Sequence, residues 1–563
     1  MNTAPTTLAA AVLDQARRTP EAIAVRDGDH ALDYAALDAA SAAVARALRH
    51  RGVRPGQAVA VCLPRSRHLV CAMLGILRLG AVVVPLDAQS PPERRAHILA
   101  DAGCTALLHD GTPPAELPDG VLPLAVGELT AADDGTPPAE PAPDGVSFVF
   151  YTSGTTGRPK GVEVRDAGIL RLARPGWLRP GPPAARHACL SNPAFDAISF
   201  EIWAPLLTGG CCVVLGDGDV QTPDRLAAAL RRERIDTVFI TVALFNAVVD
   251  KLPDCFAGAG RVLVGGEQLN APIIRAWYRH NADADTQLYN VYGPTEATTF
   301  ALIHPIPRDF DGDVVPIGRE LPGTDALLAA EDGTRAAAPG ELAELLLAGE
   351  ALAAGYRNLP EETGRRFVRL PWHDGGERRW YRTGDLVRLD AAGQVVHVGR
   401  ADRQVKVRGF RIEPGELERQ ILTHPAVRQA HVGAHRDETH GVNELVAYVV
   451  LGDDLAYEGY ERHLAATLPS YMRPHRTHLV EALPLTGNGK VDQKALSARA
   501  GEPWRPAGTT GPAATAVQRE LLALAGEILG GTAPPARRPL DRLRRRLAQG
   551  PATPLRSTSS LGP

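Results

Sequence analysis

Lysine is scarce in this chain of 563 residues. Only five of the 61 basic residues are lysines, namely Lys160, Lys251, Lys406, Lys490 and Lys494, and the other 56 are arginines. Because arginine is the default cation here, each lysine is a candidate for a place that needs a compact point charge instead of a planar fork. Acidic residues number 65, and the resulting net charge of −4 argues against a dedicated nucleic-acid-binding protein.

Cysteine and long apolar runs are also in short supply. The seven cysteines include no C-x-x-C pair, which argues against a disulfide framework or a zinc site and indicates a reducing compartment. The longest apolar stretch, Ala72 to Leu86, is interrupted by Arg78 and Pro85, so no transmembrane helix is predicted. Charges within Leu8 to Val25 exclude a signal peptide. We therefore expect a cytoplasmic protein without a membrane partner.

The first 390 or so residues alternate helical and strand patterns, which predicts an α/β fold built on parallel sheets. Leu37 to Leu48 is amphipathic and predicts a helix, while the apolar runs Ala58–Leu63 and Ala81–Leu86 predict buried strands. The pattern at Glu341–Ala348 indicates a strand of a more β-rich subdomain. We assign residues 1–399 to one large domain.

A boundary near residues 399–402 introduces a second, small α+β domain that we place at residues 400–498. The patterns there predict helices at Glu416–Leu422 and Tyr457–Leu468, and strands at Val427–Gly433 and Glu444–Leu451. Residues 499–563 are rich in proline and arginine, which indicates a disordered tail.

A glycine-rich loop follows the predicted strand Ser147–Tyr151, with the sequence Tyr151-Thr-Ser-Gly-Thr-Thr-Gly-Arg-Pro-Lys-Gly161. Its glycines let backbone N–H groups approach phosphate oxygens, and its hydroxyls and Lys160 add donors and charge. It is not a Walker loop, because Lys160 follows a proline and no Gly-Lys-Ser/Thr is present. A solvated turn is the alternative, and the hydroxyl pattern over eleven residues disfavours it.

This loop resembles the phosphate-binding loop of the adenylate-forming superfamily, and specifically of the amino-acid adenylation domains of nonribosomal peptide synthetases. Further motifs of that family occur in its order over roughly residues 8–498. They are Leu79-Gly-Ala-Val-Val-Val-Pro-Leu-Asp87, Asn290-Val-Tyr-Gly-Pro-Thr-Glu296, Tyr381-Arg-Thr-Gly-Asp-Leu386, Gly399-Arg-Ala-Asp-Arg-Gln-Val-Lys-Val-Arg-Gly409, Leu468-Pro-Ser-Tyr-Met472 and Asn488-Gly-Lys-Val-Asp492. The ordered set is a far more specific signal than any one motif.

The resemblance implies attack of a carboxylate on the α-phosphorus of ATP, which gives an acyl-adenylate and pyrophosphate, with Mg²⁺ as cofactor. Two anions must meet, so the site must supply positive charge and orientation. By resemblance, Tyr292 stacks on adenine, Asp385 accepts hydrogen bonds from the ribose hydroxyls, and Glu296 with Thr156 lies on the metal side. The full set of ATP-binding residues so implied is Thr152, Ser153, Gly154, Thr155, Thr156, Gly157, Lys160, Asn290, Tyr292, Gly293, Thr295, Glu296, Asp385 and Arg400.

The catalytic residue implied by the resemblance is Lys490, which would bridge the substrate carboxylate and the α-phosphate. A second step, thioester formation on a phosphopantetheine arm, involves rotation of the small domain about a hinge at Asp402, with Lys406 and Gly409 on the face presented afterwards. The chain departs from the family at His397, where tyrosine or phenylalanine is usual, and a neutral imidazole still stacks.

The implied amino-acid pocket opens with Asp196, which matches the carboxylate that pairs with a substrate α-ammonium. An unpaired buried carboxylate is costly, so a substrate with an amine is favoured over a fatty or aryl acid. The other pocket positions in the large domain carry no charge, and phenylalanine rings narrow the pocket volume, which favours a branched aliphatic side chain, isoleucine-like and then valine. The positions are Asp196, Ala197, Phe200, Phe239, Leu263, Gly265, Val291, Thr299 and Phe300, together with Lys490.

No carrier attachment motif follows, although Thr515 to Leu529 resembles the first helix of a carrier domain. We expect a stand-alone enzyme that loads a phosphopantetheinylated carrier protein in trans, with a small activator protein as a further candidate partner. The basic tail either docks an acidic carrier or stays solvated, the latter being favoured.

The sequence alone leaves two alternative interpretations open. One is an acyl-CoA synthetase-like ligase, which Asp196 disfavours. The other is a catalytically silent amino-acid or nucleotide binder. The joint presence of four residues with catalytic or ATP-binding roles in the family disfavours the silent binder, these being Lys160, Glu296, Asp385 and Lys490.

Overall fold

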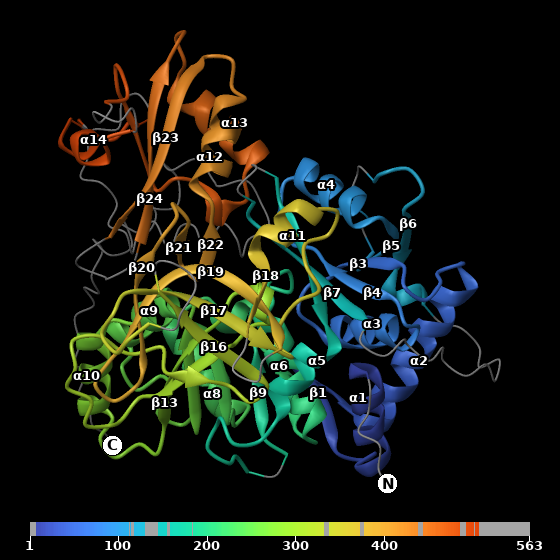
Figure 1. Cartoon of the computed structure of the whole chain (residues 1–563). Coiled ribbons are helices and arrows are strands. Elements are labelled where there is room, and N and C mark those ends of the chain that lie inside the picture. Colours follow the sequence, from blue (N-terminus) through green and yellow to red (C-terminus); the bar gives the residue numbers. More distant parts are fainter. Residues whose placement is uncertain are drawn as a thin grey trace, which may run out of the picture. The chain divides into compact units, whose positions relative to one another are not determined.

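The computed structural model describes residues 7–111, 113, 117–129, 145–154, 158–182, 184–330, 337–371, 376–436, 443–484, 491–499 and 501–505. Lys490 and the predicted tail helix at residues 515–529 lie outside these ranges. All the elements below belong to one compact unit, Met1–Gly511 (Figure 1).

A six-stranded sheet lies at the N-terminal side of the unit, in the order β6-β5-β3-β4-β7-β8. Its strands are parallel except for the antiparallel pair β7 and β8. The predicted strands 58–63 and 81–86 are β3 and β4, and both are buried along their whole length, as expected for a sheet covered on both faces. The strands are β3 (Ala58–Cys62), β4 (Val82–Pro85), β5 (Cys104–His109), β6 (Leu122–Ala125), β7 (Val146–Thr152) and β8 (Lys160–Arg165).

A nine-stranded sheet has the order β15-β14-β13-β12-β11-β9-β10-β1-β2. Its central strands β1, β10, β9, β11, β12 and β13 are parallel, so their carboxyl ends share one edge. The strands are β1 (Ile23–Asp27), β2 (His30–Asp33), β9 (Arg186–Cys189), β10 (Cys211–Val214), β11 (Thr237–Thr241), β12 (Arg261–Gly265), β13 (Gln287–Tyr292), β14 (Leu302–Pro305) and β15 (Arg319–Glu320).

The predicted β-rich subdomain is an antiparallel five-stranded sheet. Four of its strands have the order β16-β17-β19-β18, and the fifth, β20, also pairs with β19. The predicted strand at 341–348 is β17. These strands are β16 (Thr324–Ala329), β17 (Ala343–Gly349), β18 (Phe367–Pro371), β19 (Glu377–Leu389) and β20 (Val395–Arg400).

The C-terminal elements begin with a two-stranded hairpin and continue as a three-stranded sheet, β23-β24-β25. Helices α12 and α13 share one apolar core with this sheet, and Leu496 of α14 belongs to a separate apolar cluster. Pro414 stands in the first turn of α12, where its missing N–H costs nothing. The strands are β21 (Val405–Val407), β22 (Phe410–Ile412), β23 (Val427–Arg436), β24 (Asn443–Leu451) and β25 (Arg476–Leu479).

Helices of the α/β part cover the parallel strands, and several begin at side-chain caps. Thr7, Asp33, Ser66, Thr222, Thr241 and Asn270 each accept a backbone N–H of the first turn of their helices. The helices are α1 (Leu8–Arg18), α2 (Tyr34–His50), α3 (Arg67–Arg78), α4 (Pro92–Ala102), α5 (Asp166–Leu170), α6 (Ala197–Leu207), α7 (Asp217–Val220), α8 (Pro223–Arg232), α9 (Val242–Lys251), α10 (Ala271–His280), α11 (Pro360–Arg366), α12 (Pro414–Leu422), α13 (Tyr457–Thr467) and α14 (Gln493–Arg499).

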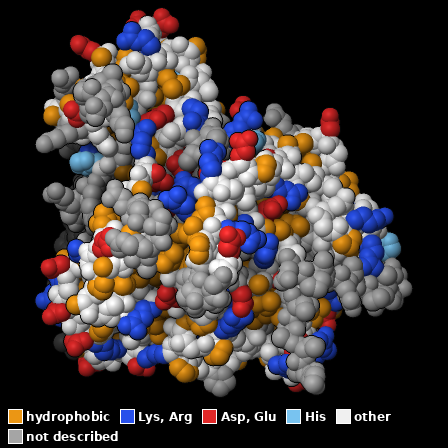
Figure 2. All heavy atoms as spheres, viewed as in Figure 1, with side chains coloured by type: hydrophobic (Ala, Val, Ile, Leu, Met, Phe, Trp, Pro, Cys, Tyr) orange, Lys and Arg blue, Asp and Glu red, His pale blue; other side chains and the backbone are white. Residues whose placement is uncertain are grey.

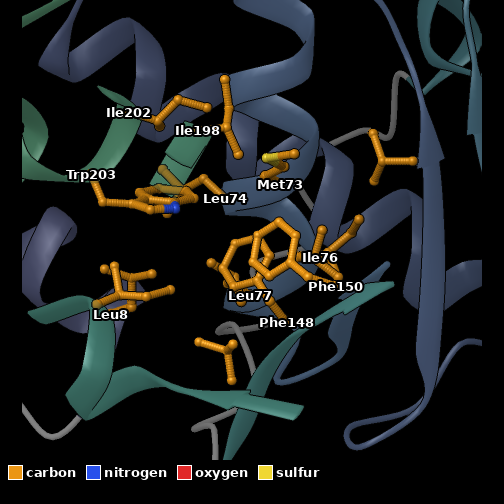
Figure 3. Close-up of a cluster of buried hydrophobic side chains, with 14 of the residues drawn as sticks. Leu8, Met73, Leu74, Ile76, Leu77, Phe148, Phe150, Ile198, Ile202 and Trp203 are labelled. Carbon is orange, nitrogen blue, oxygen red and sulfur yellow. The ribbon is translucent and has the colours of Figure 1, made fainter. Parts of the chain in front are cut away.

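The main core joins the two large sheets. Apolar side chains from α1, α3 and α6 meet Phe148 and Phe150 of β7, whose rings stack 5.4 Å apart (Figure 3). Trp203 of α6 tilts against Phe148 at 6.1 Å. This shared core fixes β7, which leads into the predicted phosphate loop, relative to α6, which carries the predicted pocket positions Ala197 and Phe200.

All seven cysteines are buried free thiols. On the face drawn in Figure 2, side chains of both charge signs alternate with apolar ones. Over the described ranges, no helix has both the length and the apolar character that crossing a bilayer requires. The α/β architecture with an additional C-terminal α+β part confirms the predicted fold class.

Candidate active site

Glu296 lies at the centre of a buried cluster of charges. Strand β13 ends at Tyr292, and a short 3-10 helix, Thr295–Ala297, carries Glu296 with 0% exposure. Gly293 makes this turn possible, because a Cβ atom there would stand 2.2 Å from the carbonyl oxygen of Thr299. The predicted GPTE motif thus turns the carboxylate inward.

Three side chains surround the Glu296 carboxylate. Tyr356 Oη donates to Oε1 at 2.6 Å, Lys160 Nζ lies 3.7 Å from the same oxygen, and Arg411 Nη1 donates to Oε2 at 2.7 Å. Burial alone would raise the pKa of Glu296, but the charges of Arg411 and Lys160 outweigh it and hold the pKa at about 2. The carboxylate is therefore ionised at neutral pH.

The predicted phosphate loop starts where β7 ends and returns at β8. The antiparallel register pairs Thr152 with Lys160, so Lys160 stands opposite the start of the loop. Lys160 is buried and lies over the Tyr356 ring, 4.2 Å from its centroid. Gly154 is required here, because a Cβ atom would stand 2.0 Å from the carbonyl oxygen of Arg158. Thr155, Thr156 and Gly157 lie outside the described residues.

C-terminal elements reach the described start of this loop. Ser153 Oγ donates to the carbonyl oxygen of Arg411 at 2.6 Å, and the Gly154 amide donates to Glu416 Oε2 at 3.0 Å. The other oxygen of Glu416 accepts Arg94 Nη1 at 2.6 Å. In this arrangement the Glu416 carboxylate, which is an anion like phosphate, accepts the hydrogen bond of the Gly154 amide in the loop.

Asp385 forms a second buried charge cluster. It lies on β19 and accepts hydrogen bonds from Tyr292 Oη and from Arg400 Nη1, the latter at 2.6 Å. Its carboxylate also lies 3.3 Å from His397 Nε2. Burial opposes ionisation, but His397, Lys406 and Arg400 together lower the pKa of Asp385 well below its ordinary value. A carboxylate with these properties suits hydroxyl donors such as those of a ribose.

Three further predicted residues, Asn290 of the ATP site, Asp402 of the hinge and Lys406 of the face after it, have defined partners. Lys406 Nζ of the hairpin lies 4.9 Å from the Tyr292 ring centroid. The Asn290 amide donates to the carbonyl oxygen of Pro316 at 2.7 Å, so this side chain braces the neighbouring loop. The predicted hinge residue Asp402 accepts Arg400 Nε and Nη2 at 2.8 and 2.9 Å and lies 3.6 Å from Arg366.

The predicted pocket positions come together at the carboxyl edge of the nine-stranded sheet. Phe239 pairs with Leu263, and Gly265 pairs with Val291, across adjacent strands. One cluster of apolar side chains unites Phe200, Phe239, Leu263, Val291 and Phe300, with Ala197 packed against it. Gly265 is needed where β12 approaches β13 closely, because a Cβ atom there would stand 2.5 Å from the carbonyl oxygen of Val291.

Asp196 precedes α6 beside this apolar cluster. Its backbone carbonyl accepts Thr299 Oγ1 at 2.9 Å, which ties the two predicted pocket positions together. Burial raises the pKa of the Asp196 carboxyl to about 6, in spite of a hydrogen bond from Thr295. The site thus combines an apolar cluster, a carboxylate whose ionisation is disfavoured by burial, and two charge clusters.

Several site residues escaped the sequence prediction. Arg411, Tyr356 and Glu416 contact the expected ATP residues from 60 to 262 positions away in the chain. His397 was noted only as a stacking residue, whereas it faces Asp385. The one available signal for Arg411 was a charged residue two positions after the 399–409 motif. Over the described ranges, no group of three or more His, Cys, Asp or Glu side chains gathers as a ready-made metal site.

Comparison with known proteins shows the family to which the chain is similar. The family model described as "AMP-binding enzyme" matches residues 12–357, and the one described as "AMP-binding enzyme C-terminal domain" matches residues 416–490. Malpibaldin synthetase of Mortierella alpina is 38% identical over 90% of this chain and 9% of that protein. The AMB antimetabolite synthetase AmbB of Pseudomonas aeruginosa is 38% identical over 86% of this chain and 38% of that protein. This chain therefore spans well under half the length of these curated relatives.

Among solved structures, PA1221, a nonribosomal peptide synthetase protein containing adenylation and PCP domains, superposes with a TM-score of 0.77 at 33% identity. The match covers 88% of this chain and 97% of that chain. The chain belongs to the AMP-binding enzyme family, in the group of nonribosomal peptide synthetase adenylation domains, and is an AMP-forming ligase.

Proposed function

We propose that this ligase activates a branched aliphatic amino acid, isoleucine-like and then valine, and passes it in trans to the phosphopantetheine thiol of a carrier protein. The observation that carries the amino-acid half of this proposal is Asp196. A carboxylate that burial makes costly is stabilised when a substrate ammonium pairs with it. A fatty or aryl acid would leave it unpaired beside an apolar pocket.

In the first step the substrate carboxylate attacks the α-phosphorus of ATP, and pyrophosphate leaves. Asp196 orients the amino end, and the apolar cluster accommodates the side chain. Asp385 would accept the ribose hydroxyls, and Tyr292 would stack on the adenine. Lys160 and the loop amides favour the phosphates, and Lys490 would bridge the substrate carboxylate and the α-phosphate.

The residues present fit Mg²⁺. Glu296 is a hard oxygen ligand that is fully buried and ionised, and magnesium sites of this kind use one or two carboxylates together with substrate phosphates. Glu296, with Thr156, would hold the ion. When bound, Mg²⁺ supplies charge neutralisation at the phosphate oxygens.

The second step is attack of the carrier thiol on the adenylate carbonyl, which forms the thioester and releases AMP. We propose that residues 400–498 form the small domain that moves between the steps about Asp402, relative to residues 1–399. The Gly154 amide, which would otherwise be free to bind a phosphate oxygen, donates to Glu416, and Arg411 contacts Glu296. These contacts support a role for the hairpin and α12 after pyrophosphate has left.

We expect the affinity for the amino acid to weaken as the pH falls through about 6, the pKa of unliganded Asp196. Only the ionised carboxylate pairs with the α-ammonium, so binding is strong above this pKa and is lost as the carboxyl becomes protonated below it. Titration calorimetry of the amino acid at several pH values measures this dependence. An Asp196→Asn variant should bind weakly at every pH, and an unchanged pH profile in that variant would refute the assignment.

We expect Asp402→Pro to lower carrier loading about tenfold or more while changing adenylation by less than about twofold. Proline fixes φ near −65°, which removes the freedom a hinge residue needs. Asp402→Asn is the matched control, since it removes the ion pairs with Arg400 and Arg366 but keeps the backbone free. Equal losses in both reactions for Asp402→Pro would count against the hinge.

The proposed function is tested in two linked assays. Pyrophosphate exchange with a panel of amino acids should give the highest kcat/KM for isoleucine or valine. Mass spectrometry of a separate holo-carrier protein should then show the aminoacyl thioester. Turnover with fatty acids and coenzyme A, but not with amino acids, would favour an acyl-CoA synthetase-like ligase.

A further inference from the structure

Trp177 lies behind the amino-acid pocket and belongs to no motif of the sequence. It stands in the segment between the 3-10 helix Arg171–Ala173 and β9, and only 8% of its surface is exposed. Its indole meets the Phe200 ring edge-on with centroids 5.7 Å apart, and it lies 6.3 Å from the Phe300 ring. The residue therefore contacts two of the expected pocket positions.

The three pocket phenylalanines themselves form a chain of contacts. The Phe200 and Phe300 rings are 5.3 Å apart in a T-shaped arrangement, and Phe300 is 5.3 Å from Phe239. Trp177 belongs to the same apolar cluster as these rings, and it comes from outside the pocket positions. Since close-packed rings transmit displacement to their neighbours, the location of the indole limits how far Phe200 and Phe300 can retreat.

The segment that carries Trp177 is anchored to the sheet two residues later. The backbone N–H of Arg179 donates to Tyr289 Oη at 3.1 Å, and its carbonyl oxygen accepts Arg261 Nη1 at 3.2 Å. The Arg179 guanidinium also pairs with Asp285 at 3.1 Å. These hydrogen bonds to β12 and β13 fix the backbone next to Trp177, so the indole can support the Phe200 and Phe300 rings.

On another side, Phe200 rests against a buried histidine. The His187 ring lies 5.5 Å from the Phe200 ring, and burial lowers the pKa of His187 to about 3. The imidazole is therefore neutral at physiological pH and adds no charge behind the pocket. Phe200 thus contacts both Trp177 and His187.

We propose that Trp177 is a specificity-determining positioning residue, which sets the depth of the side-chain pocket by holding the rings of Phe200 and Phe300. The inference rests on the proposed function only in that these rings face the substrate side chain. It predicts that loss of the indole moves selectivity toward larger side chains, whichever amino acid the parent enzyme prefers.

The test compares Trp177→Ala and Trp177→Phe with Trp277→Ala and Trp277→Phe. Trp277 of α10 is a matched control, because it is 2% exposed and edge-on to Tyr278 at 5.3 Å, but packs in a different apolar cluster. The readout is the kcat/KM for leucine, methionine and phenylalanine relative to isoleucine in pyrophosphate exchange. Binding of isoleucyl and phenylalanyl sulfamoyl-adenosine analogues gives the same ratio without turnover.

We expect Trp177→Ala to raise the ratio for a larger side chain about tenfold or more, Trp177→Phe to raise it less, and both Trp277 variants to leave it within about twofold. If Trp177→Ala does not fold, the Trp177→Phe shift decides. An unchanged ratio in the Trp177 variants, or an equal shift in the Trp277 variants, would overturn the inference. If the parent enzyme activates only acids without an amine, the proposed function is refuted instead. The ratio of binding affinities for the two sulfamoyl-adenosine analogues then still tests the role of Trp177.

Discussion

Replacing Glu296 by glutamine is expected to lower pyrophosphate exchange about a thousandfold, the scale of losing one preorganised electrostatic group. The carboxylate is fully buried between Lys160 and Arg411 and remains ionised. An amide removes the negative charge that would hold Mg²⁺ and leaves two cations without their counterion. Exchange kinetics, measured as kcat/KM for ATP, report the loss.

The matched control is Glu233→Gln. Glu233 is also a buried carboxylate with arginine partners, Arg26 and Arg186, but it contacts none of the expected ATP residues in the described structure. Its variant should lose stability and keep its kcat/KM within about threefold. If the two variants lose activity equally, the catalytic role of Glu296 is wrong and the loss is structural.

Stability provides an independent readout of the same change. The pKa of Glu296 is about 2 in the folded protein, against an ordinary value of 4.5. A depressed pKa contributes stability above the unfolded value, and this contribution is lost as the pH falls from about 4.5 toward 2. The shift corresponds to roughly 3 kcal/mol. Denaturant unfolding of Glu296→Gln should show a flatter pH dependence across that window than the parent.

Removing Lys490 is expected to reduce adenylation about a thousandfold or more while ATP affinity changes little. In the described part of the site, Lys160 and Arg411 are paired with Glu296, and Arg400 with Asp385. These cations are already compensated, so the charge that gathers between substrate carboxylate and α-phosphate needs another partner. We propose that Lys490 supplies it.

Lys490→Ala is best compared with Lys494→Ala, which removes the same side chain four residues later in the sequence. Exchange should be nearly abolished in the first variant and normal in the second, with similar ATP dissociation constants by calorimetry. Near-normal exchange in Lys490→Ala would defeat the assignment. Lys490→Arg tests the point-charge idea, because full activity would show that a planar guanidinium serves equally well.

What the sequence predicts well is local. Tyr292 ends strand β13 and Glu296 follows it within a few residues, and Lys160 opens the strand that pairs with the phosphate-loop strand. A short motif next to an apolar run therefore defines both the element and the side chain at its end. The pocket positions Phe239 and Val291 likewise lie on two parallel strands, whose common edge a βαβ pattern implies.

What the sequence does not predict is the choice of distant partner. Arg411 reaches Glu296 across 115 residues, and Glu416 reaches Gly154 across 262. Many of the 56 arginines would look equally suitable for such a contact, because periodicity says nothing about tertiary pairing. Trp177 belongs to no motif at all, and only its ring contacts with Phe200 and Phe300 draw attention to it.

We propose above all that this chain forms an aminoacyl-adenylate. Amino-acid-dependent exchange of labelled pyrophosphate into ATP tests it most directly, with the purified chain, Mg²⁺ and isoleucine. We predict exchange far above the rate without amino acid, and its loss in Asp196→Asn. Exchange that is indifferent to every amino acid but responds to a carboxylic acid without an amine would contradict the account.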